Sequence, residues 1–108
     1  MELTSLEVAL LEIYRQTYAT NGFPKVGDIR VVERAYSGNG SFTGLQADGR
    51  VEGTHRVLGI DTLIEVAGVP NGMGTVLFLE DGLLATLEIY VNGGDHWSGD
   101  LTGLRLVR

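Results

Sequence analysis

TVLFLEDGLLATLEIYV, residues Thr75–Val91, is the stretch that decides the fold, because two apolar arms meet at Asp81-Gly82. A two-residue connection whose twist matches that of its strands needs positive φ at both central residues, and Asp and Gly tolerate this conformation. From Leu83 to Val91 apolar residues alternate with more polar ones, as in a half-buried strand. The stretch therefore predicts a β-hairpin whose tip is Asp81-Gly82.

The pairing register of this hairpin follows from the length of its loop. A two-residue loop pairs Phe78 with Ala85 and Val76 with Leu87. A type I turn with a bulge at Gly82 shifts the pairing by one residue. We expect the first register, because it gathers the polar residues on one face. That face carries Thr75, Leu77, Thr86 and Glu88.

An amphipathic helix is predicted from Leu3 to Thr20, where apolar residues recur at three- and four-residue spacing. Thr4 and Glu7 fit a capping box at its start. Asn21-Gly22 offers a left-handed residue at its end, and a proline two residues on prevents continuation. We expect the helix to cover one face of a sheet, because a chain of this size needs a second layer.

The remaining apolar stretches read as strands that are separated by turn residues. Gly38-Asn39-Gly40 makes either a tight hairpin or a glycine-rich bulge or bend. The sequence thus predicts an α+β fold in a single domain, 1–108, with an N-terminal helix packed on a bent antiparallel β-sheet or partial barrel of five to seven strands. The further strands are expected at Ile29–Tyr36, Phe42–Ala47, Ile60–Val69 and Leu101–Val107.

The composition excludes several classes of partner. The chain has 14 acidic and 8 basic residues and a formal net charge of −6, whereas proteins that bind nucleic-acid phosphates cluster Lys and Arg. We therefore expect no nucleic acid as partner, and the acidity favours a basic protein. No apolar run approaches the roughly 20 residues that span a bilayer and no secretory signal is visible, so we expect a cytoplasmic protein without membrane contact.

The loop Asp95–Asp100 holds the densest group of chemically versatile side chains, including His96 and Trp97. A metal site needs three or four converging ligands, and the spacing of Asp95, His96 and Asp100 with His55 matches no known ligand pattern. We expect no metal and no cofactor. Trp97 is interpreted as the cap of an open end of the core, with its N–H satisfied at the edge.

Glu88 lies inside a predicted strand, where it is a candidate binding group beside Tyr90 or an arginine such as Arg34. Burial beside apolar residues would raise its pKa and suit it to act as a general base, but no catalytic partner is identifiable by spacing. No catalytic residue is assigned. The candidate binding residues are Arg34, Tyr36, Glu88, Tyr90, His96 and Trp97.

One pattern runs from Arg34 to Trp97: an Arg, a Gly-x-Gly followed by an aromatic and Thr, an apolar strand ending in Asp-Gly, a Leu-Glu-x-Tyr arm and a Trp-containing loop. It resembles a group of small, functionally uncharacterised bacterial proteins, and it fits proteins of mobile integron cassettes. Ser41, between the second Gly and the aromatic, and Ser98, in place of a Pro after the Trp, depart from the pattern. The resemblance implies a helix followed by an antiparallel sheet, and it implies no activity. The matching positions are Arg34, Gly38, Gly40, Phe42, Thr43, Leu87, Glu88, Tyr90 and Trp97.

The function that these features favour is that of a non-enzymatic binding protein, including an immunity-like role against a basic partner. One helix covers only part of a sheet, so exposed leucines favour a homo-oligomer, most simply a dimer. We expect its contact to include Leu77, Leu84 and Thr86.

Two alternative functions remain open at the level of the sequence. One is a small-molecule-binding protein with a pocket between helix and sheet. The other is a small hydrolase or isomerase that uses Glu88 and His96. The residues expected to line the pocket of the first alternative are Tyr14, Tyr36, Tyr90 or Trp97.

Overall fold

The computed structural model describes all 108 residues and contains one α-helix, two 3-10 turns and seven strands. The helical elements are α1 (Ser5–Thr17), η1 (Ala19–Asn21) and η2 (Val26–Asp28). The strands are β1 (Arg30–Tyr36), β2 (Gly40–Gln46), β3 (Val57–Gly59), β4 (Leu63–Glu65), β5 (Met73–Glu80), β6 (Leu83–Val91) and β7 (Arg105–Val107).

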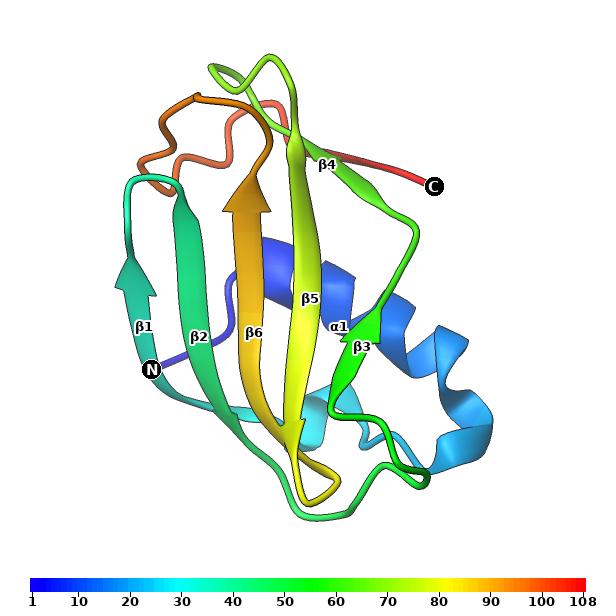
Figure 1. Cartoon of the computed structure of the whole chain (residues 1–108). Helices are drawn as coiled ribbons and strands as arrows, with labels where there is room; N and C mark the ends of the chain where they lie inside the picture. The colour runs from blue at the N-terminus through cyan, green and yellow to red at the C-terminus, as the bar shows by residue number, and fades with distance from the viewer.

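The strands form one antiparallel sheet in the order β1-β2-β6-β5-β4-β7, and β3 also pairs with β5. The sheet does not close into a barrel. Helix α1 lies across one face of the sheet, and no element covers the other (Figure 1). We call the face under α1 the inner face and the opposite one the outer face. The predicted α+β fold, a helix packed on an antiparallel sheet, is confirmed.

Helix α1 begins at the predicted capping box. The Thr4 hydroxyl accepts a hydrogen bond from the Glu7 N–H at 3.1 Å, and the Thr4 N–H donates to the Glu7 carboxylate at 2.8 Å. The helix ends at Thr17, earlier than predicted, because the chain tightens into η1 before Gly22 adopts a left-handed φ of 77°.

The central hairpin has the predicted tip. Asp81 (φ 51°) and Gly82 (φ 80°) connect β5 to β6, as the need for two positive φ angles implies. Leu79 pairs with Leu84, in agreement with a two-residue loop. Beyond that pair Phe78 faces Thr86, so Ala85 is an extra residue that forms a β-bulge.

The predicted register is therefore wrong beyond Leu79, because the bulge moves every later pair by one residue. Val76 faces Glu88 rather than Leu87. Leu77 is fully buried and Leu84 is 4% exposed, so both belong to the core under α1 and not to the predicted oligomer contact. Thr86 remains on the outer face.

The flanking strands are shorter than the sequence pattern suggests. Only Leu63–Glu65 of the predicted Ile60–Val69 strand, and only Arg105–Val107 of the predicted Leu101–Val107 strand, pair as strands. Strand β3 comes from the segment Arg50–Gly59, where the sequence suggests no more than that Val57 and Leu58 enter a strand. It shares one edge of β5 with β4, and the short connection between these two strands interrupts the ladder. Pairing at that edge is divided between two short strands instead of one long one.

The core lies between α1 and the inner face and consists of two apolar clusters. The larger contains Leu11, Leu77 and Leu87 and extends toward the hairpin tip; the smaller contains Leu6, Leu10, Ile64, Met73, Ile89 and Trp97. Polar side chains from α1, β1, β2 and β5 also reach this interface. The buried polar residues among them are Glu7, Ser41, Thr43 and Thr75.

Candidate functional site

The outer face is assembled by the pairing registers of five strands. One row across the sheet runs Ala35, Phe42, Glu88, Val76 and Gly59. Because side chains of paired residues point to the same side of a sheet, each row is a line of neighbouring groups. The next row toward the hairpin tip runs Glu33, Gly44, Thr86, Phe78 and Val57.

Large apolar side chains on this face remain exposed, because no second layer covers them. The exposed fractions are 43% for Phe42, 48% for Val57 and 40% for Tyr90. Tyr90 extends over Gly74 on the neighbouring strand, where a side chain would collide with its ring. A contiguous apolar surface that keeps contact with solvent marks an interaction site more often than a scattered set does.

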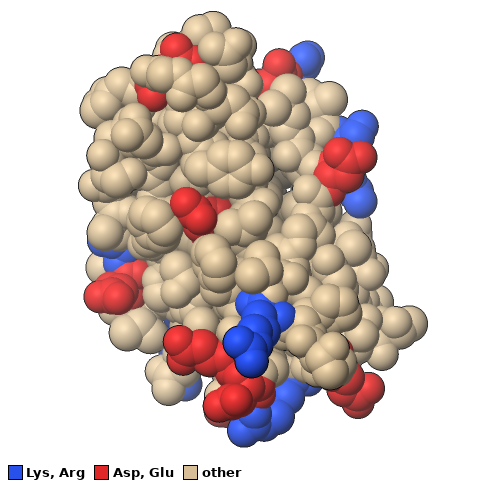
Figure 2. Space-filling model, viewed as in Figure 1, with Lys and Arg blue, Asp and Glu red and all other residues tan.

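Glu88 is the one charged side chain near the middle of the outer face. Its cross-strand neighbours are Phe42 and Val76, and it forms no ion pair. Figure 2 shows a wide uncharged area that surrounds a single acidic group, with the other charges at the edges and toward the hairpin-tip end, where basic and acidic groups lie together. The face therefore combines apolar surface with one unneutralised negative charge.

A groove of about 440 Å³ opens on the outer face at its hairpin-tip end. It forms where the β2–β6 ladder stops at the pair Gly44–Thr86. Two bulges flank it, one at Val32 in β1 and one at Ala85 in β6. We call this the hairpin-end groove. Its lining residues are Val32, Glu33, Gly44, Leu45, Gln46, Ala47, Glu80, Asp81, Leu83, Leu84, Ala85 and Thr86.

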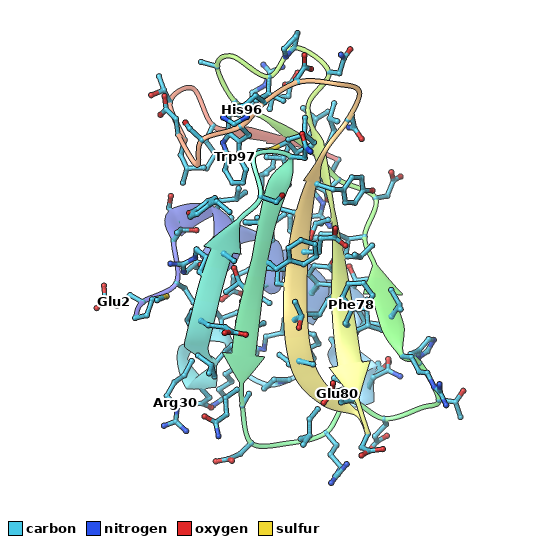
Figure 3. The ribbon with its side chains drawn as sticks, turned by 60° about the vertical axis from the view of Figure 1, so that its left-hand side comes forward. Glu2, Arg30, Phe78, Glu80, His96 and Trp97 are labelled. Carbon is cyan, nitrogen blue, oxygen red and sulfur yellow. The ribbon has the colours of Figure 1, made fainter.

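The other end of the sheet holds the predicted tryptophan loop. Trp97 is 4% exposed within the smaller core cluster, and its ring N–H donates to the Asp100 carbonyl at 2.9 Å. This confirms that Trp97 caps an open end of the core. Tyr36 meets the Trp97 ring edge-on at 5.7 Å, and His96 packs against Gly38. His96 and Trp97 lie at the end opposite Glu80 (Figure 3).

Arg34 lies on the inner side of the sheet, away from Glu88. Its guanidinium forms an ion pair with Glu7, which is 1% exposed, and its Nε donates to the Glu7 carboxylate at 2.9 Å. The Thr43 hydroxyl donates to the same carboxylate at 2.5 Å. Burial by itself raises the pKa of Glu7, but the hydrogen bonds from Arg34, Thr43 and Thr4 outweigh it and leave the pKa lowered. This network ties α1 to the sheet.

A second polar contact joins α1 to β5. The Tyr14 hydroxyl lies 3.3 Å from the Thr75 hydroxyl, which donates in turn to the Glu88 carbonyl at 2.9 Å. Burial raises the pKa of Tyr14 to about 12. The polar groups in both buried contacts therefore have hydrogen-bond partners inside the protein, as buried polar groups with a structural role do.

The predicted binding residues fall in three separate places. Glu88 and Tyr90 share the outer face, and Tyr36, His96 and Trp97 gather at the tryptophan loop. Arg34 stands apart in its ion pair with Glu7. No groove is lined by Tyr14, Tyr36, Tyr90 or Trp97.

Several outer-face residues were not anticipated from the sequence. Phe42 was assigned to a strand without a face, and Val57 was expected at most to enter a strand, also without a face. Val76 and Phe78 were expected on the apolar, core-facing side of the hairpin, and the bulge at Ala85 is the reason that they are not. The signal that could have located Phe42 is the alternation of β2, once Thr43 is recognised as a partner of buried Glu7.

No three His, Asp or Glu side chains converge closely enough to hold a metal ion, and no helix has the length and apolar character that crossing a bilayer requires. Comparisons with protein-family models, with curated proteins and with solved structures gave no match.

Proposed function

We propose that this protein is a non-enzymatic interaction protein that binds another protein through the outer face of its sheet. The observation that carries the proposal is the uncovered apolar surface around Phe42, Val57 and Tyr90 with Glu88 at its middle. No hydrogen bond or ion pair links Glu88 to His96, so the geometry offers less support for an acid–base pair.

The size of the face suits a protein partner. The four long strands β1, β2, β6 and β5 span roughly 450 Å², from a strand spacing of about 4.8 Å and a rise of about 3.3 Å per residue. A standard protein interface buries about 800 Å² on each partner. The sheet alone supplies more than half of that area, and the surrounding loops supply the rim.

The charge of the face favours a basic partner. Glu88 has no cation within the chain, and the whole protein carries a net charge of −6. A partner that places Lys or Arg opposite Glu88 neutralises it, whereas an uncharged partner would bury it unpaired at a cost. Masking the surface of a basic protein is the immunity-like form of this function.

Self-association through the same face is the second candidate. Exposed Phe42, Val57 and Tyr90 favour it, since a dimer removes them from water on both copies. A twofold dimer, however, brings together two acidic copies and their two Glu88 side chains. The two candidates therefore respond to salt in opposite directions: added salt weakens the attraction to a basic partner and relieves the repulsion between copies.

The test compares three forms of the protein. Phe42→Thr/Val57→Thr removes apolar surface from the outer face, and Val8→Thr removes an equally exposed valine from α1. A partner captured from the source cells by the wild type and by Val8→Thr should bind the double variant about tenfold more weakly. Equal binding by all three forms would place the contact elsewhere and reject the proposal.

The same experiment separates the two candidates. Sedimentation equilibrium of the isolated protein at low and high salt measures self-association directly. For a basic partner, Glu88→Gln weakens capture and the isolated protein stays monomeric. For a homodimer, Glu88→Gln and added salt both strengthen self-association.

A further inference from the structure

The hairpin-end groove combines an apolar floor with an acidic border. Half of its lining residues are hydrophobic, among them Leu45 and Leu83, and we call these the floor; the acidic residues Glu33, Glu80 and Asp81 also line it, and we call these the border. No Lys or Arg lines it. A groove of this composition fits a side chain that is apolar along its stem and positively charged at its end.

We propose that this groove receives an arginine side chain from a basic partner protein, as the anchor of the interaction proposed for the outer face, on which this inference rests. The anchor's methylene groups lie on the floor, and its guanidinium faces the carboxylates at the border. An arginine suits this site better than a lysine, because its guanidinium is less strongly hydrated and binds two carboxylates at once.

The charge of the groove is not neutralised within the chain. The two ion pairs of the protein are Arg34–Glu7 and Arg105–Glu65, and neither involves a groove carboxylate. Arg50 donates to the main-chain carbonyl of Asp81, and Arg56 lines a separate groove with Glu80 and Asp81, yet neither forms an ion pair there. Glu33, Glu80 and Asp81 therefore have no ion-pair partner within the chain, and Arg50 and Arg56 place positive charge nearby.

The groove is continuous with the outer face. Gly44 and Thr86, which form the last pair of the β2–β6 ladder, line the groove and also belong to the rows of the outer face. Glu88 follows Thr86 by two residues on the same face of β6. A partner segment that fills the groove therefore continues over Phe42 and Glu88, and the volume of about 440 Å³ lies within the range of roughly 300–1,000 Å³ typical of ligand sites.

The test uses two synthetic peptides, acetyl-Leu-Arg-Leu-amide and the same peptide with citrulline, a neutral isostere of arginine. Each is titrated into the ¹⁵N-labelled protein while backbone amide shifts are recorded. The expected shifts cluster at Val32–Glu33, Gly44–Ala47 and Leu83–Thr86. The arginine peptide should bind about fivefold more tightly than the citrulline peptide, the gain expected of a partly exposed ion pair, and added salt should reduce this difference.

Two triple variants separate the groove from the overall charge. Glu33→Gln/Glu80→Gln/Asp81→Asn neutralises the border and should abolish the preference for arginine. Glu2→Gln/Glu12→Gln/Glu52→Gln changes the net charge by the same amount away from the groove and should preserve it. The amide spectrum of each variant verifies that the fold is retained.

Three results would overturn the inference: no shifts at millimolar peptide, equal binding of the two peptides, or an equal loss of preference in both triple variants. These results are distinct from a failure of the proposed function. If Phe42→Thr/Val57→Thr binds its partner normally while the groove still prefers arginine, the outer-face proposal fails and the groove stands. If the double variant loses its partner but the two peptides bind equally, only the inference about the groove is rejected and the outer-face proposal stands.

Discussion

The two faces of the sheet distribute polar and apolar groups in opposite ways, and strand β2 shows the contrast within a few residues. Ser41 and Thr43 point inward and are buried at 2% and 0% exposure, whereas Phe42 between them points outward and is 43% exposed. On the inner face polar groups are hidden beneath a helix. On the outer face aromatic and aliphatic groups meet water.

The difference teaches which polar groups are structural. On the inner face, Arg34 and Thr43 donate hydrogen bonds to the carboxylate of Glu7, and the hydroxyl of Tyr14 lies within hydrogen-bonding distance of Thr75. Glu88 on the outer face has no ion-pair partner among the cations of the chain. Buried matched groups fix the position of α1, and the unmatched charge of Glu88 is the group that the proposed basic partner would neutralise.

The contrast between the two faces is tested most directly by truncating adjacent side chains of β5 that point to opposite faces. Leu77→Ala should lower the free energy of unfolding by about 3 to 4 kcal/mol, because it opens a cavity in the core. Val76→Ala, on the partly exposed outer face, should lower it by only about 1 kcal/mol. Urea unfolding of both variants measures the difference. Equal losses would show that both faces are packed alike.

The ion pair beneath α1 should give the next largest effect. Glu7→Gln leaves the partly buried guanidinium of Arg34 without its counter-charge and should cost about 2 to 3 kcal/mol near neutral pH. The pKa of Glu7 is lowered from its ordinary value of 4.5. Its stabilising contribution is therefore complete above that value and is lost as the pH falls below it through the folded-state pKa.

Chemical unfolding at a series of acidic pH values tests this dependence, and Glu7→Gln should flatten it. Thr43→Val removes one donor to the carboxylate and should flatten it in part, whereas Thr43→Ser keeps the donor and serves as the matched control. An unchanged acid dependence in Glu7→Gln would show that the network does not stabilise the fold.

The smallest effect should come from the tyrosine beneath the sheet. Tyr14→Phe removes the contact with Thr75, which still donates to the Glu88 carbonyl, and should cost about 1 kcal/mol. The pKa of Tyr14 is raised to about 12, so its burial stabilises the fold below pH 10.0, the ordinary value, and that contribution is lost as the pH rises toward 12.

Unfolding measured from neutral to alkaline pH follows this loss, which should be absent from Tyr14→Phe. Tyr36→Phe, at an exposed position, should leave the unfolding free energy within about 0.5 kcal/mol of the wild type. If Tyr36→Phe were the more damaging of the two, the assignment of Tyr14 to the structural interface would be wrong.

Much of the fold could be predicted from short stretches of the sequence. The Asp81-Gly82 tip and the Thr4–Glu7 capping box need specific residue types at fixed spacing, and both are confirmed. The position of Trp97 also followed from a general property, the need of a large ring for an apolar site with a partner for its N–H. Signals of this kind do not depend on distant parts of the chain.

The bulge and the candidate site could not be predicted from the sequence, because they depend on tertiary contacts. Nothing local distinguishes Ala85 as an unpaired residue, and its position decides that Val76 and Phe78, rather than Thr75 and Leu77, share the outer face with Glu88. Thr43 is buried because a carboxylate from α1 meets it there. Apolar-in, polar-out alternation fails on β2 for that reason, whereas the assignment of Leu77 and Leu84 to a contact surface was wrong because of the bulge at Ala85.

The bulge at Ala85 accommodates one extra residue in β6 without changing the face to which the later residues point. The residue contributes no pairing, so many side chains are acceptable there. If Ala85 were paired regularly instead, Leu87 and Ile89 would turn toward solvent and Glu88 toward the core, because successive residues of a strand point to alternate sides. Loss of the codon for Ala85, by contrast, would leave Leu84 opposite Leu79 and Thr86 opposite Phe78, and it would remove only the bulge.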